Sequence, residues 1–317
     1  MRLLYAIGFL TRLRIPQKLL QKNDGKRIHY PELLSYFPLA GLLIGFLNFS
    51  VFFIFNFVFP PLFTSAAVVV LEILLTGGLH LDGLADTFDG YFSKETSSGK
   101  IIEIMKKSNT GVFGVISIVL AILLKIILVY SILTGLGIGT LFNFAGGSLA
   151  DGSFTDFGPG AIMMFMVLLF TPVFGRLSMN YLFANYEPAC KTGSLVLLFK
   201  DNSNRASYRM QAFLYSVFYT VAFVAGKYFY LRHINSAVEQ NINHRLIYII
   251  SIFLIESLFV LFIYSVSVSV TARFFVKKIG GITGDVIGAV SVIAEIYFLF
   301  FSLLFLQALR LYSAFLA

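Results

Sequence analysis

Seven long apolar stretches constrain this chain more than any other feature. A helix needs about 20 mostly apolar residues to cross a bilayer, and stretches near that length cover residues 36–59, 61–77, 110–133, 161–181, 211–231, 246–270 and 286–306. Only 13% of the 317 residues are charged, so these stretches cannot all form the interior of a water-soluble domain. The sequence therefore predicts an all-α integral membrane protein, a single polytopic domain over residues 1–317 with about seven transmembrane helices.

The placement of Lys and Arg predicts how the chain is oriented. These residues gather in the N-terminal segment and in the connections after the second, fourth and sixth apolar stretches, which together carry 18 of the 24 Lys and Arg residues. Seven spans put these four segments on one side, and cytoplasmic loops are the ones enriched in Lys and Arg. We expect a cytoplasmic N-terminus. Membrane topology then explains most of the net charge of +8 without nucleic-acid binding.

Residues 1–30 are expected to form a basic interfacial segment rather than a cleaved signal peptide. Arg12 and Arg14 interrupt the first apolar run, and no small-residue cleavage site follows it. A short helix with a basic face is typical of segments that lie in the membrane interface.

The strongest chemical signal is the acidic segment 77–90, GGLHLDGLADTFDG. In a helix, the spacing of Asp82, Asp86 and Asp89 places the three carboxylates on one face. Like charges repel there, so the pattern favours a bound hard cation such as Mg²⁺, which shares its shell with substrate phosphates. The alternative is a solvated acidic segment at the membrane edge.

Two further segments on the same predicted side carry related signals. Segment 280–285, GGITGD, repeats the Gly-Gly-apolar-x-x-Asp pattern of segment 77–82, so Asp82 and Asp285 are expected to converge on one ligand. Segment 105–114, MKKSNTGVFG, places Lys, Ser and Gly at a helix start, a pattern that suits a phosphate. Residues 78–109 and 271–286 are accordingly expected to be cytoplasmic catalytic loops.

Charged residues inside the apolar stretches are costly and therefore informative. Arg176 lies near the inner end of its stretch, where its guanidinium could hold a phosphate. Lys125 is expected to form a buried pair with Glu256 or, as the second choice, Glu72. His80, within the acidic segment, is a candidate general base or metal ligand, with a structural role as the alternative.

The motifs resemble those of one known family. GFLTRLRIP at 8–16, YFPLAGLLIG at 36–45, GGLHLDGLADTFDG, MKKSNTGVFG and GGITGDVIGA at 280–289 occur in the same order in cobalamin synthase, the membrane-bound adenosylcobinamide-GDP ribazoletransferase family. The resemblance is collinear over nearly the whole chain. The chain departs from the family pattern at Lys107, where Asp is usual, at Asn109, where Arg is usual, and at Val292, where Glu is frequent.

The resemblance implies a specific reaction. Such enzymes transfer the adenosylcobinamide-phosphate group from adenosylcobinamide-GDP to α-ribazole or its 5′-phosphate, with Mg²⁺ as cofactor. The products are GMP and adenosylcobalamin or its phosphate, a late step of cobalamin biosynthesis. The implied location is the cytoplasmic membrane of a prokaryote, with an open cavity for the large corrinoid facing the cytoplasm. The partners are the two substrates and the lipid bilayer, and a homo-oligomer or a complex with other corrinoid-assembly enzymes stays open.

The motifs and the resemblance together give the candidate site. The metal ligands are Asp82, Asp86 and Asp89, and the catalytic residues are His80, Asp82 and Asp285. The substrate- and cofactor-binding residues are Gly83, Lys106, Lys107, Ser108, Gly111, Arg176 and Gly284.

Three alternatives compete with this assignment. A CDP-alcohol phosphotransferase also carries an Asp-Gly-x-x-Ala motif, but Asp86 stands where that family has Arg. A corrinoid transporter would place its binding groups near the bilayer midplane, whereas the densest polar cluster here lies at one face. An inactive scaffold for corrinoid assembly is suggested by Lys107 and Asn109.

Overall fold

Helices make up almost all of the secondary structure. The computed structural model describes residues 1–16, 29–107, 109–135, 159–190, 192, 194–200, 204–234 and 239–316. Their elements are α1 (Arg2–Leu10), α3 (Tyr30–Leu33), the 3₁₀ turn η1 (Leu34–Tyr36), α4 (Phe37–Asn56), α5 (Pro61–Thr76), α6 (Leu79–Phe92), α7 (Ser98–Met105), α8 (Val112–Gly135), α10 (Pro159–Asn185), α11 (Leu195–Phe199), α12 (Asn204–Ile234), α13 (Glu239–Ile279) and α14 (Gly284–Leu316). These residues form no strand beyond an isolated bridge between Pro188 and Ile282.

In the described parts of the chain, five helical segments are long and apolar enough to cross a membrane. They are Tyr30–Asn56, Val112–Gly135, Ala161–Asn185, Phe253–Ile279 and Gly284–Gln307, and the bent pair of α5 and α6 makes a sixth if it counts as one span. Each of the seven predicted stretches falls mainly within one helix. The count differs because α5, with 16 residues, is too short to cross alone and α12 is not among the five. The chain is an all-α, multi-pass membrane protein.

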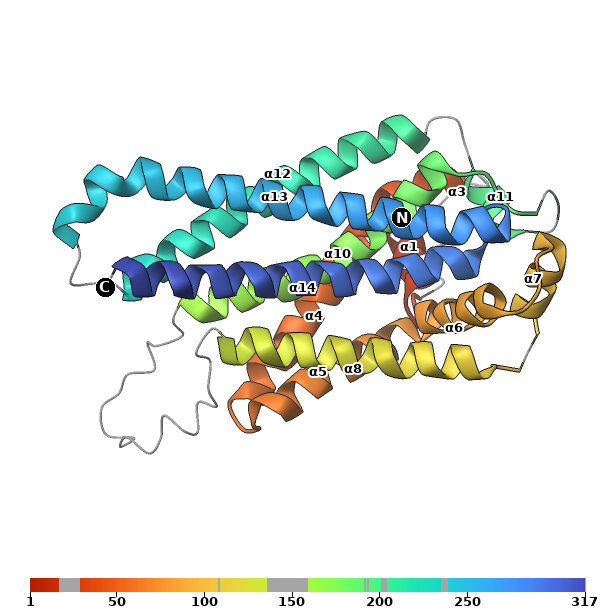
Figure 1. The fold of residues 1–317 in the computed structure, drawn as a ribbon, viewed down its shortest axis with the longest axis horizontal. Coiled ribbons are helices and arrows are strands. Elements are labelled where there is room, and N and C mark those ends of the chain that lie inside the picture. The colour runs from red at the N-terminus through yellow and green to blue at the C-terminus, as the bar shows by residue number, and fades with distance from the viewer. Residues whose placement is uncertain are drawn as a thin grey trace.

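Helices α8, α13 and α14 run in nearly the same direction, α4, α10 and α12 are inclined to them, and the connections gather at the two ends (Figure 1). Helices α6, α7 and α11 lie toward one end, together with the start of α8 and the turn between α13 and α14. The turn between α4 and α5 and the last part of α14 lie toward the opposite end. The described parts of the Lys- and Arg-rich segments of the sequence therefore share one end of the molecule.

A sharp bend separates α5 from α6. The two helices meet at 88°, and the bend consists of Gly77 and Gly78, whose φ angles of 62° and 72° are left-handed. The Gly77 N–H closes the last turn of α5. The Arg12 side chain packs where a Gly77 side chain would lie, and the Arg12 N–H donates to the Leu75 carbonyl at 2.7 Å. The N-terminal segment thus braces the bend.

The segments expected to be cytoplasmic loops are largely helical. Residues 78–109 contain α6 and α7, and residues 271–279 are the last part of α13. Leu84 on α6 and Ile101 on α7 are buried, and α6 packs along α14. Burial of these apolar side chains against the bundle stabilises the two helices.

Four charged side chains from four helices meet inside the bundle. We call Glu72, Lys125, Arg176 and Glu295 the buried ion cluster; each is at most 8% exposed. The Lys125 Nζ donates to Glu72 Oε1 at 2.8 Å and to Glu295 Oε2 at 2.7 Å, and Arg176 Nη1 donates to Glu295 Oε1. Lys125 therefore pairs with Glu72, the second of the two residues expected from the sequence, and with Glu295, which was not expected as its partner. The structure does not give Glu256, the first choice, as a partner of Lys125. An unpaired charge is costly in a membrane interior. The ion pairs of this cluster therefore hold α5, α8, α10 and α14 together.

Candidate active site

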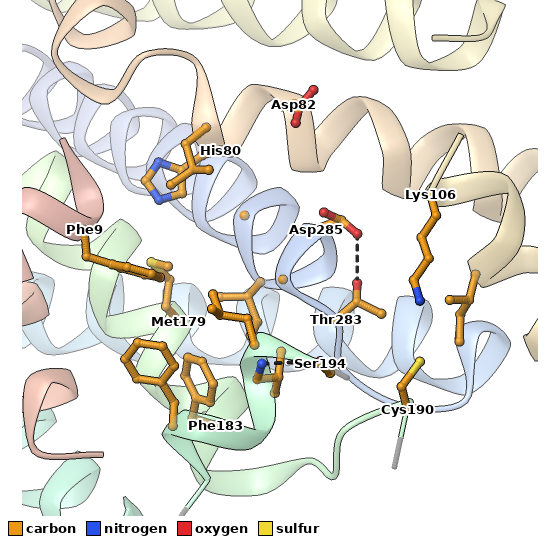
Figure 2. Close-up of a pocket in the computed structure, with 18 of the residues that line it drawn as sticks. Phe9, His80, Asp82, Lys106, Met179, Phe183, Cys190, Ser194, Thr283 and Asp285 are labelled. Atoms are coloured by element: carbon orange, nitrogen blue, oxygen red, sulfur yellow. Dashed lines mark hydrogen bonds between the residues drawn. The ribbon is translucent and has the colours of Figure 1, made fainter. Parts of the chain in front are cut away.

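A cavity of 360 Å³ opens where α1, α6, α10, α11 and α14 come together. Figure 2 shows that its walls differ in character. Asp82, Lys106, Thr283 and Asp285 lie on one side, whereas Phe9, Met179 and Phe183 lie on the other. The cavity therefore has a polar end and an apolar end.

The polar end is built by two helices that begin in the same way. Helix α6 follows the glycine pair 77–78 and helix α14 follows the pair 280–281, and all four glycines have positive φ angles. Each helix carries an acidic residue in its first turn, Asp82 or Asp285, where the helix dipole stabilises a negative charge. Both residues line the cavity, so the two Gly-Gly segments meet at one cavity.

Gly83 brings the two acidic helices into close contact. A Cβ atom at Gly83 would lie 2.8 Å from the Asp285 carbonyl oxygen. The missing side chain at this position serves the approach of α6 to α14, and Gly83 is not among the residues that line the cavity. Gly284 does line it, and no atom lies within 4 Å of the position that a Gly284 side chain would take.

We call Asp82, Asp86, Asp89 and Asp285 the aspartate group. Burial and the neighbouring charges of the other three members raise the pKa of Asp86 to about 6. In the described part of the chain, no ion pair joins any member to a Lys or Arg. Four clustered carboxylates without such a partner favour binding of a cation.

The donors of the aspartate group fit Mg²⁺, which takes oxygen ligands. Among the described residues, no three His, Cys, Asp or Glu side chains are close enough to hold a metal by themselves. Mg²⁺ in phosphate-transfer sites is usually held by one or two carboxylates and completes its shell with water and substrate phosphates. The arrangement fits an ion that binds together with a phosphorylated substrate.

Asp89 is already bound to the start of α8. Its two carboxylate oxygens accept hydrogen bonds from the Gly111 N–H at 2.6 Å and the Gly114 N–H at 2.8 Å. Gly111 was expected to donate to a phosphate, but its amide donates to a carboxylate of the protein. Lys107 is exposed and does not line the cavity, whereas Lys106 does. Ser108 lies outside the described residues.

His80 lies between the cavity and the buried ion cluster. It lines the large cavity and also a 20 Å³ void bordered by Glu72, Lys125 and Glu295. Burial and the charge of Arg176 lower the pKa of His80 to about 3, and its Nε2 has no hydrogen-bond partner in the described structure. A neutral imidazole with so low a pKa is a weak proton acceptor at pH 7.

Arg176 does not reach the cavity. It is completely buried, donates to Glu295, and is absent from the lining. The structure therefore brings His80, Asp82, Lys106, Gly284 and Asp285 together at the cavity. The other described candidates, Gly83, Asp86, Asp89, Lys107, Gly111 and Arg176, are not part of its lining.

The apolar end is the part of the site that the sequence did not indicate. Leu195, Val196 and Phe199 on α11 line it, and Ser194 caps this short helix by accepting from the Val196 N–H at 3.3 Å. Residues 187–189, between α10 and α11, are bound to the α13–α14 turn by two backbone hydrogen bonds. The Ala189 N–H donates to the Ile282 carbonyl at 3.0 Å, and the Ile282 N–H donates to the Glu187 carbonyl at 2.9 Å. The apolar run 195–199 is visible in the sequence, but the sequence does not show that this run packs against α1.

Comparison with known proteins gives a consistent result. The chain is 32% identical over 308 residues to the adenosylcobinamide-GDP ribazoletransferase of Acetivibrio thermocellus, covering 96% of this chain and 98% of that protein. The protein of the same name from Caldanaerobacter subterraneus subsp. tengcongensis is 30% identical, over 95% of this chain and 98% of its own length. No solved structure matches the chain. The model of the family described as cobalamin-5-phosphate synthase matches residues 2–303, and the chain belongs to this family.

Proposed function

We propose that this chain is a membrane-embedded transferase that joins adenosylcobinamide-GDP to α-ribazole or its 5′-phosphate and releases GMP. The names of the relatives supply the reaction. The observation that carries the proposal is that Asp82 and Asp285 line the same cavity as Lys106. Carboxylates for a metal and an ammonium group for a phosphate are the groups that phosphoryl transfer requires.

Each polar group at the cavity has a role in this reaction. A ribose hydroxyl attacks the β-phosphorus of the diphosphate, an O–P bond to the ribazole forms, and the P–O bond to GMP breaks. Asp82 and Asp285, which line the cavity, would hold Mg²⁺ together with the diphosphate, and the nearby charge of Asp86 would favour the ion. The metal, when bound, supplies charge neutralisation at the diphosphate. Lys106 binds the departing phosphate. Asp285 orients the attacking hydroxyl, and its proton passes to Asp285 or to water.

His80 acts on this proposal as an orienting residue rather than as the base. Its pKa of about 3 keeps the imidazole neutral, and a neutral imidazole can still exchange hydrogen bonds with a substrate hydroxyl. The metal site differs in one respect from the sequence-based expectation. Asp89 belongs to the aspartate group, but its carboxylate accepts hydrogen bonds from the start of α8. In this proposal Asp285 replaces Asp89 as a metal ligand.

We also propose the orientation of the chain in the membrane. The end that carries α6, α7 and α11 faces the cytoplasm of a prokaryote, with the N-terminus on the same side. Four segments of the sequence carry 18 of the 24 Lys and Arg residues, and the described parts of these segments share this end, which supports the proposal. Seven spans result when α12 and the bent α5–α6 pair cross together with the five long apolar segments.

The test is product formation by the protein in nanodiscs with adenosylcobinamide-GDP, α-ribazole phosphate and Mg²⁺. GMP and a cobamide should appear in equal amounts, and both should be lost in Asp82→Ala. Glu103→Ala, which removes an exposed acid on the neighbouring helix α7, should retain activity. GMP without a cobamide would mean hydrolysis. Corrinoid uptake into vesicles without GMP would favour a transporter, and no reaction with either acceptor would favour a scaffold.

A further inference from the structure

The size of the cavity limits which substrate it encloses. Its 360 Å³ is near the lower end of the range of about 300–1,000 Å³ that buries drug-sized ligands. Adenosylcobinamide-GDP combines a corrin macrocycle with two nucleosides and is several times larger than one nucleoside. α-Ribazole is a single nucleoside with a planar dimethylbenzimidazole base. The volume of the cavity suits the ribazole, whereas most of the corrinoid substrate would lie outside it.

The apolar end has the composition expected for a flat, weakly polar base. Phe199 is the centre of an aromatic group there: its ring centroid lies 5.2 Å from that of Phe9, 5.8 Å from Phe37 and 5.5 Å from Phe183. Such distances are typical of favourable aromatic pairs. Leu195 and Met179 complete the wall. An aromatic base that enters gains further contacts of the same kind.

The polar end lies where the ribose of such a ligand would emerge. In Figure 2 the aromatic side chains stand on one side of the cavity and Asp285 on the other, with Asp82 farther up on α6. A nucleoside with its base among the phenylalanines therefore directs its sugar hydroxyls toward the aspartates. The diphosphate of the second substrate can approach those aspartates from outside the cavity.

We infer that the apolar end, formed by Phe9, Phe37, Phe183, Leu195 and Phe199, is the binding site for the aromatic base of the ribazole. This inference rests on the proposed function. It assigns the acceptor to the cavity and the corrinoid nucleotide to its acidic opening. The wall from α11 then sets which bases are accepted, because it contacts the base and not the reacting phosphate.

Two leucines on α11 provide a matched test. Leu195 lines the cavity and is 52% exposed, whereas Leu198 on the same helix is 48% exposed and does not line it. We expect Leu195→Ala to raise the KM for α-ribazole phosphate about tenfold, the effect of losing roughly 1.4 kcal/mol of apolar contact. The KM for adenosylcobinamide-GDP should stay within twofold. Leu198→Ala should leave both values within twofold of the wild type.

Binding measured without turnover separates this inference from the proposed reaction. Calorimetric titration with α-ribazole alone should show binding by the wild type and by Leu198→Ala, and about tenfold weaker binding by Leu195→Ala. That result would support the base site even if no cobamide forms. A cobamide-forming enzyme in which Leu195→Ala changes neither KM, or raises chiefly the KM for adenosylcobinamide-GDP, would overturn it. Absence of ribazole binding to the wild type would also overturn it.

Discussion

The buried ion cluster and the aspartate group use charge in opposite ways. The ion cluster contains two acids and two bases on four helices, and Lys125 and Arg176 both donate to Glu295. The aspartate group contains four acids, and in the described structure none of them is ion-paired with a base. Along α14, the two sites are represented by Glu295 and Asp285, ten residues apart.

This difference separates a structural role from a functional one. A buried charge that is matched within the protein stabilises one arrangement of helices, because any other arrangement leaves it unpaired. Carboxylates that only repel each other are a cost to the folded chain until a cation binds. The ion cluster should therefore control whether the bundle forms, and the aspartate group should control whether the bundle reacts.

The largest effect is expected from breaking the ion cluster. Lys125→Met leaves Glu72 and Glu295 without their shared cation, and removing one partner of a buried pair costs about 3–5 kcal/mol. We expect a large drop in the melting temperature in detergent or a failure to accumulate. Lys106→Met is the matched control, since Lys106 is exposed at the cavity, and it should melt like the wild type. If Lys125→Met and the wild type have the same melting temperature, the cluster does not stabilise the bundle.

Asp285→Asn is expected to show the opposite behaviour. The side chain keeps its shape but loses a charge that would bind the metal and orient the hydroxyl, so the rate should fall about 10²–10³-fold. The melting temperature should not fall, because the substitution removes a repulsive charge from the aspartate group. Steady-state rates and thermal melting of the same preparation test this. A large loss of stability with a normal rate would mean that Asp285 is structural.

Titration of Asp86 should sharpen the comparison further. Its pKa is raised to about 6, so the carboxylate is charged above this pH and neutral below it. Protons then compete with Mg²⁺, and at pH 5 the affinity for Mg²⁺ should be about tenfold lower than at pH 7. The apparent Mg²⁺ constant for GMP release gives this value. The Asp86→Asn variant should bind Mg²⁺ weakly at both pH values. If the apparent Mg²⁺ constant of the wild type does not depend on pH, Asp86 is excluded from the metal site.

The sequence predicted the two regions unequally. The length of the apolar stretches predicted the helices. The shared Gly-Gly-x-x-x-Asp pattern predicted that Asp82 and Asp285 lie at the same cavity, because each pattern separates two helices and puts an acid in the first turn of the second. The partners of Lys125 could not be chosen, since Glu72, Glu256 and Glu295 all lie in apolar stretches and only helix packing selects among them. The aromatic end of the cavity could not be predicted for the same reason. It is formed by residues on four helices, Phe9, Phe37, Phe183 and Phe199, and only helix packing brings them together.

Asp89 tests where the aspartate group ends. Its carboxylate lies close enough to affect Asp86, yet both of its oxygens accept from the amides at the start of α8. Loss of such a cap costs about 0.5–2 kcal/mol, so Asp89→Ala should lower the melting temperature by a few degrees. The apparent Mg²⁺ constant should change little. Asp89→Asn, which keeps one acceptor oxygen, should recover part of the lost stability. If instead both variants melt like the wild type and need much more Mg²⁺, then Asp89 is a ligand, and the cap at α8 contributes little to the fold.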